Sequence, residues 1–215
     1  MSTDHLPSIV KSKKFENPIW NIAIDEVKSS LMVETRDATT RQIQVYVLDT
    51  TSMTLSPLTL EMEWWEKWIG MKENKLYTVR YEDQNDPTRH TFHSFHLING
   101  ERVEVDMLPE LSSPTQEPEL YEHGTEYHQM VASFLSVDLP LACEYHESSD
   151  QIIISYYLRS ENGFNRYLLV IADEEKVFNI LQDRGMKGFA IGAFFVYNDQ
   201  LIFIKDGHEV CIYTL

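Results

Sequence analysis

Four short runs of alternating polar and apolar residues follow one another between Trp68 and Val105, and they constrain the fold more than any other part of the chain. Short polar segments separate the runs, and one of these segments is Asn99-Gly100. Alternation with period two, rich in β-branched and aromatic residues, predicts strands, and Asn-Gly between two such runs predicts a hairpin. The sequence therefore predicts a four-stranded antiparallel meander. Its strands are Trp68–Lys72, Leu76–Tyr81, Thr91–Ile98 and Arg102–Val105.

The same pattern recurs elsewhere in the chain. Aligning Val33 with Val79 places apolar residues on one face of both strands and charged residues on the other. A turn with Asp or Asn follows the third strand of three units, at Asp49, Asn99 and Asp173, although such turns are common in any β protein. The predicted units are residues 19–59, 68–105, 142–181 and 189–215, with an insertion over residues 106–141.

These repeats predict an all-β fold of antiparallel meanders with about four strands each. We expect a small or incomplete β-propeller-like assembly, and a β-sandwich is the alternative. The last unit has three strand candidates, which end with Val210–Tyr213. An unpaired strand edge invites association with other chains. We therefore expect part of residues 7–16 to lie as a strand or extended segment against the C-terminal unit.

The insertion is predicted to contain one helix, over Thr125–Ser136. Five apolar residues recur there with helical spacing, which places them on one face. Thr125 can cap the N-terminus, and Pro140 stops the helix. We expect this helix to cover the sheets. The apolar stripe consists of Tyr127, Met130, Val131, Phe134 and Leu135.

The length and composition of the chain fit one soluble domain over residues 1–215. A chain with 43% hydrophobic residues can bury a large core. No export signal and no membrane span is recognisable, which favours the cytoplasm. In that reducing compartment we expect Cys143 and Cys211 to remain unpaired thiols.

The chain is strongly acidic, and its acids are unevenly distributed. Thirty-four Asp and Glu against 18 Lys and Arg give a net charge of −16, and residues 103–158 contain eleven acids and no Lys or Arg. This charge argues against nucleic acid and against an anionic membrane as partners. An acidic face suits a protein partner with a basic surface, although solubility alone also accounts for it. The sequence does not decide the oligomeric state.

No motif with a recognisable catalytic or metal-binding spacing is present. His90, His93 and His96 lie in one predicted strand, where His93 points away from the other two. The outer two would be roughly 20 Å apart at ~3.3 Å per residue, too far to share an ion. We therefore predict no metal site, no cofactor and no assigned catalytic residue.

The candidate binding residues are charged and aromatic side chains in equivalent places of the first two units. The charged ones lie on the polar face of equivalent strands, with Asp37 and Asp83 at the strand ends. Opposite charges can pair there across neighbouring units, and structural ion pairing is favoured over a binding role. Trp64 and Trp65 form an aromatic cluster for which packing between sheets is favoured over a ligand cage. The charged candidates are Glu34, Arg36, Asp37, Arg80, Glu82 and Asp83.

Several segments together resemble an uncharacterised bacterial family, a domain of unknown function. They are Trp20, Glu34-x-Arg36-Asp37, Trp64-Trp65, Asp86-Pro87, Lys187-Gly188, Phe194-Phe195 and Leu201–Ile204. The resemblance spans nearly the whole chain and implies a repeated β fold without any assigned activity. The strand, Asp turn and tryptophan pattern is more loosely similar to quinoprotein-type propeller blades. The chain lacks the glycine that normally ends that turn after Asp49 and Asp173, which argues against quinone binding.

Two functions from different classes remain open. The first is a non-catalytic interaction or ligand-binding module, which we favour because no catalytic site is visible. The second is an enzyme with an acid/base site in a central pocket. A pocket with two or more converging carboxylates or histidines of perturbed pKa would favour the enzyme.

Overall fold

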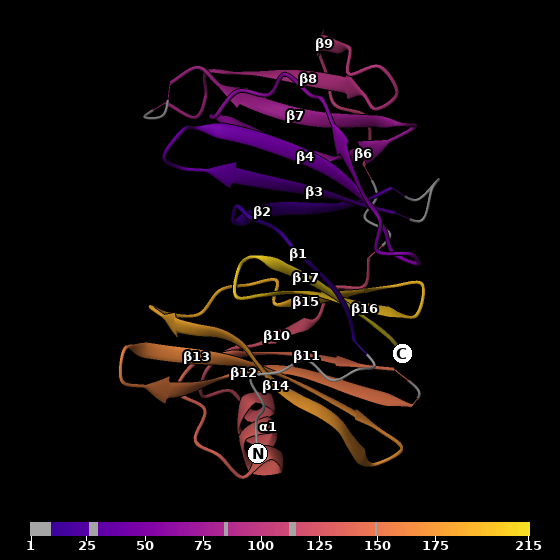
Figure 1. The fold of residues 1–215 in the computed structure, drawn as a ribbon. Coiled ribbons are helices and arrows are strands. Elements are labelled where there is room, and N and C mark those ends of the chain that lie inside the picture. Colours follow the sequence, from indigo (N-terminus) through magenta and orange to yellow (C-terminus); the bar gives the residue numbers. More distant parts are fainter. Residues whose placement is uncertain (1–9, 26–29, 84–85, 112–114, 149) are drawn as a thin grey trace. The chain divides into compact units, whose positions relative to one another are not determined.

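The computed structural model describes residues 10–25, 30–83, 86–111, 115–148 and 150–215 (Figure 1). The described residues form four antiparallel sheets and one α-helix. They divide into two compact units, residues 15–114 and residues 10–14 with 115–215. Within these ranges, no helix has the length and apolar composition needed to cross a bilayer.

The unit of residues 15–114 contains two meanders, each of four strands in sequence order. The first meander consists of β2 (Ile19–Asp25), β3 (Ser30–Asp37), β4 (Gln42–Asp49) and β5 (Leu55–Leu58). The second consists of β6 (Glu66–Lys72), β7 (Lys75–Tyr81), β8 (His90–His96) and β9 (Arg102–Val105). The four strands predicted between Trp68 and Val105 are confirmed, with ends that differ by a few residues, and residues 19–59 contain a second meander of the predicted kind.

The turn between β8 and β9 shows why Asn-Gly was a strong signal. Gly100 has a φ of 72°, and its N–H donates to the carbonyl of His96 at 2.8 Å. A Cβ at this position would lie 2.6 Å from the carbonyl oxygen of Thr59. The turn therefore needs glycine both for its left-handed conformation and for the close approach of another backbone.

The two meanders of this unit share one apolar core. Met32 and Val45 come from the first sheet, and Leu76 and Phe95 come from the second. Both faces of β3 are buried over most of its length, as expected for a strand that packs on both sides. The polar residues of β3 are therefore enclosed, which the predicted alternation of apolar and charged faces did not indicate.

The other unit contains a five-stranded and a four-stranded sheet. The five-stranded sheet consists of β10 (Glu119–Tyr121), β11 (Cys143–Glu147), β12 (Gln151–Ser160), β13 (Gly163–Ala172) and β14 (Glu175–Met186). The four-stranded sheet has the order β1-β17-β16-β15, with β1 (Lys11–Lys14), β15 (Phe194–Tyr197), β16 (Gln200–Lys205) and β17 (Glu209–Thr214). The antiparallel meanders predicted in these two units are confirmed, whereas β10 lies in the insertion, for which only a helix was predicted.

The N-terminal strand completes the sheet at the C-terminus, as the sequence predicted. β1 pairs antiparallel with β17, in a register that aligns Lys11 with Ile212. Ser12 Oγ donates to Glu209 Oε1 at 2.6 Å, and Val10 is buried in the core beside this sheet. The part of the prediction that concerns residues 7–9 lies outside the described residues.

The five-stranded sheet packs on both of its faces. Ile153 and Leu168 face the four-stranded sheet, whereas their neighbours Ile154 and Leu169 face α1 (Glu126–Leu135). Because successive strand residues point to opposite faces, continuous apolar runs are what such a middle layer requires. Figure 1 shows α1 against this sheet.

The helix has the predicted ends, but its apolar stripe is only partly buried. The Thr125 side chain accepts a hydrogen bond from His128 N–H, and Ser136 ends the helix in the left-handed conformation. Val131 and His128 are the buried residues of α1. Tyr127, Met130 and Phe134 are 58–61% exposed. The helix covers the five-stranded sheet as predicted, but only part of its apolar stripe is buried against that sheet.

Polar side chains also join the two sheets of this unit. Gln182 of β14 is fully buried, and its Nε2 donates to the carbonyls of Ala193 at 2.7 Å and Ile204 at 2.9 Å. The carboxylate of Glu144 accepts from the N–H groups of Gly192 and Ala193 at 2.6 and 3.0 Å. Burial raises the pKa of Glu144, although these donors oppose the shift.

The all-β class with repeated meanders is confirmed. None of the four sheets closes into a barrel. The propeller-like arrangement and the single domain over residues 1–215 stay predictions. Cys143 and Cys211 are free, buried thiols, and burial raises the pKa of Cys143 to about 11.

Deleting residues 1–14 should lower the melting temperature by several degrees. The deletion removes the partner of β17 and the buried Val10, and about 1 kcal/mol shifts Tm by about 2–4 °C in a domain of this size. Differential scanning calorimetry and light scattering measure the shift and any self-association at the opened edge. A control deletion of residues 1–9 retains Val10 and β1. If both deletions leave Tm and solubility unchanged, the pairing does not stabilise the fold.

Candidate functional site

Arg36 joins the two meanders of residues 15–114. It lies near the end of β3, is 5% exposed, and donates through Nε to Glu34 Oε1 at 2.5 Å. Its Nη1 donates to the carbonyl of Trp64 at 2.5 Å, and its Nη2 donates to the carbonyl of Glu66 at 2.6 Å. The rigid fork of a guanidinium suits this arrangement, since one side chain binds a carboxylate and two carbonyls at once.

Two tryptophan rings flank the same guanidinium. The Arg36 Cζ lies 4.8 Å from the ring centroid of Trp20 and 5.4 Å from that of Trp64. A cation within about 6 Å of an aromatic face is attracted by the ring quadrupole. The position of Trp64 is therefore fixed both through its backbone carbonyl and through its ring.

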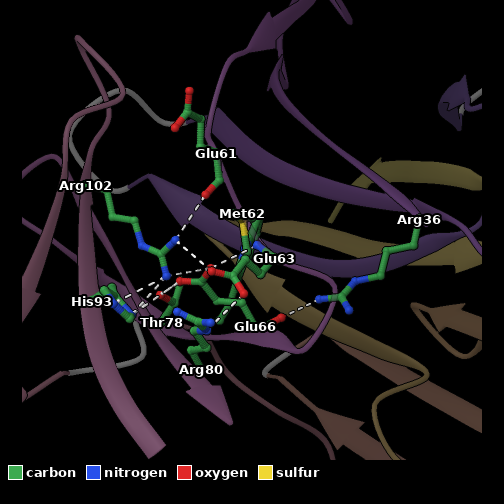
Figure 2. A network of polar contacts seen from close by, with 10 residues as sticks. Arg36, Glu61, Met62, Glu63, Glu66, Thr78, Arg80, His93 and Arg102 are labelled. Atoms are coloured by element: carbon green, nitrogen blue, oxygen red, sulfur yellow. Dashed lines mark hydrogen bonds and ion pairs between the residues drawn. The ribbon is translucent and has the colours of Figure 1, made fainter. Parts of the chain in front are cut away.

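A buried polar network surrounds the carboxylate of Glu66 (Figure 2). Thr78 Oγ1 donates to Glu66 Oε1 at 2.5 Å, and the N–H of Glu63 donates to Oε2 at 3.1 Å. Arg102 Nη2 lies 3.4 Å from Glu66 Oε2. Glu66 is fully buried, so these donors replace the water that its charge would otherwise require.

Arg102 and Arg80 extend the network to Glu63 near the surface. Arg102 Nη1 lies 3.6 Å from Glu63 Oε1, and Arg80 Nε lies 3.0 Å from Glu63 Oε2. With Glu34, Arg36 and Glu66, the network comprises three carboxyl groups and three guanidinium groups. Their formal charges balance, as expected where charged side chains are buried together.

His93 lies inside the network and favours its neutral form. Its Nδ1 is 3.3 Å from Arg102 Nη2 and 3.8 Å from Glu66 Oε1. Burial lowers the pKa of His93, and the positive charge of Arg102 lowers it further, while Glu66 opposes the shift. The pKa of Glu34 is instead raised, chiefly by burial, against the opposing effect of Arg36.

A hollow of about 350 Å³ lies beside Arg36, and we call it the tryptophan hollow. Trp20 and Trp65 are 57% and 52% exposed there, which is unusual for such large apolar side chains. Lys67 Nζ lies 5.5 Å from the ring centroid of Tyr81. The lining residues are Trp20, Arg36, Trp64, Trp65, Lys67, Tyr81, Asp83 and Pro87.

The structure brings only some of the predicted binding residues together. Arg36, Trp64, Trp65 and Asp83 line the hollow. Glu34 lies behind Arg36 as its buried partner.

The remaining predicted residues form local contacts instead. Arg80 pairs with Glu63, whereas Glu82 pairs with Arg89 at 3.1 Å on the surface. Asp37 accepts hydrogen bonds from Thr40 and Thr39 in the turn after β3, and these bonds lower its pKa.

Other residues of the site were not singled out by sequence. The predicted strand began at Trp68, so Glu66 lay outside it. In the structure Glu66 opens β6 and aligns with Arg80 of β7. A predicted strand that began two residues earlier would have placed Glu66 opposite Arg80. This cross-strand pair of opposite charges would have indicated Glu66 as a candidate. His93 was considered only as part of a possible metal-binding run, and no local pattern pairs it with Arg102 or Glu66, because these partners come from other strands.

The part of the chain that the structure describes contains no cluster of potential metal ligands. Within that part, no three His, Cys, Asp or Glu side chains are placed to hold an ion. His93 faces Arg102, a cation that would oppose a metal ion at this position.

The fold and the site can now be compared with known proteins. Residues 24–103 match DUF4905, a domain of unknown function. The predicted resemblance to a domain of unknown function is confirmed over this segment, while bacterial origin and likeness to propeller blades stay predictions. The DUF4905 segment contains the whole polar network and most of the tryptophan hollow. No curated protein matches the chain.

Replacing Arg36 by Ala should lower the free energy of unfolding by about 3–5 kcal/mol, because the buried carboxylate of Glu34 loses its cation. Urea unfolding measures the change, and Arg36→Lys should give an intermediate loss because it retains charge without the fork. The matched control is Arg89→Ala in the same DUF4905 segment. Its exposed pair with Glu82 should contribute only about 0–1 kcal/mol. Equal effects of the two Ala variants would contradict a central role for Arg36.

When the pH falls from about 7 to about 5, the free energy of unfolding should decrease less in His93→Gln than in the original chain. In the unfolded chain His93 takes up a proton near pH 6.5. In the folded chain its protonation requires a lower pH, because the pKa of His93 is lowered. The unfolded state then binds more protons, so the free energy of unfolding falls as the pH drops. Urea unfolding at both pH values provides the test. His90→Gln, exposed on the same strand, should retain the original pH dependence, and an unchanged dependence in H93Q would refute the prediction.

Proposed function

We propose that the chain is a non-catalytic binding module whose tryptophan hollow takes a small ligand with a flat ring and an anionic group. The single observation that carries this proposal is the exposure of Trp20 and Trp65 beside a fixed guanidinium. Exposed tryptophan faces offer large apolar area to a planar ring. Burying that area on a ligand provides the free energy of binding.

The charged side chains around the hollow explain why the proposed ligand carries an anionic group. The guanidinium of Arg36 is already bound to Glu34 and to two carbonyls. Lys67 is exposed, and its ammonium lies over the ring of Tyr81. An anionic group beside Lys67 would therefore gain a charge partner at the mouth of the hollow.

The composition of the lining favours binding over acid/base catalysis. Among the described residues that line the hollow, Asp83 is the carboxylate and there is no histidine. The buried carboxylates of Glu34 and Glu66 are hydrogen-bonded to the protein itself. General acid/base catalysis needs a titratable group within reach of a substrate, and these two groups are used to hold the sheets together.

The proposal predicts that 1-naphthoate binds and that its affinity depends on Trp65 and Lys67. Calorimetric titration should show saturable binding that weakens at least about tenfold, or about 1.4 kcal/mol, in Trp65→Ala. Lys67→Gln should weaken 1-naphthoate but not the uncharged 1-naphthylmethanol. Lys72→Gln, exposed on the same strand, is the matched control. Absence of binding, or equal affinity in all variants, would refute a ring-and-anion site in this hollow.

A further inference from the structure

A second hollow lies in the other compact unit, between α1 and the sheet β10–β12. Its volume is about 310 Å³, near the lower end of the range for ligand sites. Every lining residue but one is apolar or aromatic, and the exception is Glu147. We call it the tyrosine groove. Its lining residues are Tyr121, Tyr127, Met130, Val131, Phe134, Tyr145, Glu147, Ile152 and Ile154.

The apolar face of α1 forms one wall of the groove and is left uncovered. Tyr127, Met130 and Phe134 recur at helical spacing and are 61%, 61% and 58% exposed. Such a stripe normally faces a core, but α1 packs against its sheet through Val131, with Ala132 and Leu135 beside it. An exposed stripe of this kind, with an adaptable methionine at its centre, is typical of surfaces that receive an apolar segment of a partner.

A stack of tyrosine rings next to carboxylates runs from the sheet to Tyr127 of α1. Tyr121 stacks on Tyr127 and on Tyr145, with ring centroids 5.2 and 5.3 Å apart. The hydroxyl of Tyr145 donates to Glu147 Oε2 at 2.7 Å, and that of Tyr121 donates to Glu119 Oε2 at 3.4 Å. The aromatic faces and the two exposed carboxylates together favour a cation, through cation–π attraction and ion pairing.

Charge decides between the possible occupants. The groove lies within residues 103–158, where the sequence has eleven acids and no Lys or Arg. A second copy of this chain, with a net charge of −16, would bring like charges together, and an anionic membrane would be repelled in the same way. A basic segment is complementary to the groove.

We propose that the tyrosine groove binds a polypeptide segment in which apolar anchors alternate with Lys or Arg. The apolar anchors contact Met130 and Phe134, as in recognition of amphipathic segments by grooves. The basic side chains lie over Tyr127 and beside Glu119 and Glu147. This surface is separate from the tryptophan hollow, because it lies in the other compact unit.

The test uses the full chain and a short amphipathic peptide of leucine and lysine as the probe. Fluorescence anisotropy should show binding that weakens as salt screens the charges, and a leucine–glutamate peptide of the same pattern should not bind. The double variant Met130→Gln/Phe134→Gln should bind at least tenfold more weakly. Met107→Gln, at another exposed methionine in the other unit, should bind like the original chain.

Charge reversal separates groove binding from general attraction to an acidic protein. Glu119→Lys/Glu147→Lys should weaken binding at least tenfold, whereas Glu61→Lys/Glu82→Lys makes the same charge change in the other unit and should have little effect. Equal losses in both double variants, or unchanged affinity in the Met130/Phe134 variant, would overturn the proposal. Salt-independent binding of the leucine–glutamate peptide would also overturn it. Concentration-dependent dimerisation that the Met130/Phe134 variant abolishes would instead identify a second copy as the occupant.

Discussion

Each compact unit depends on buried polar side chains of one sheet that donate hydrogen bonds to backbone carbonyls in or next to the neighbouring sheet. In residues 15–114, Arg36 of β3 donates to the carbonyls of Trp64 and Glu66. In the other unit, Gln182 donates to the carbonyl of Ala193, directly before β15, and to that of Ile204 in β16. An antiparallel meander satisfies its interior backbone groups by itself, but the segments that lead from one meander to the next need other partners. A buried group without a partner costs about 1–3 kcal/mol, so these contacts select how the meanders pack.

The same requirement explains the buried acids of the protein. Burial raises the pKa of both Glu34 and Glu144, a property that is often associated with catalysis. Here each carboxylate is bound by groups of its own chain, Glu34 by a guanidinium and Glu144 by two backbone N–H groups. Their perturbed pKa values therefore follow from these contacts within the protein, and the two proposed binding surfaces are formed by other side chains.

The first exposed aromatic surface depends on one of these polar contacts, whereas the second depends on apolar packing. Trp65 lies in the same turn as Trp64, whose carbonyl and ring are both held by Arg36. The exposed face of α1 is placed by the burial of Val131 against the five-stranded sheet. Holding large rings in place before binding reduces the conformational entropy that a ligand must otherwise remove. The two units thus present different chemistry, one hollow with a lysine at its mouth and one groove beside carboxylates.

The sequence by itself determined the local elements of this protein. Period-two alternation located the strands, Asn99-Gly100 located a turn, and Thr125 marked the start of α1, because each of these signals depends only on neighbouring residues. The unpaired edge of the last unit predicted β1, because a strand edge needs hydrogen-bond partners. Only the tertiary structure decided which side chains meet. Glu66 finds Arg102, and Arg36 finds Trp64, across separations that no local pattern encodes. The exposure of Phe134 was likewise decided by packing, since helical spacing defines a face but not how much of that face a sheet covers.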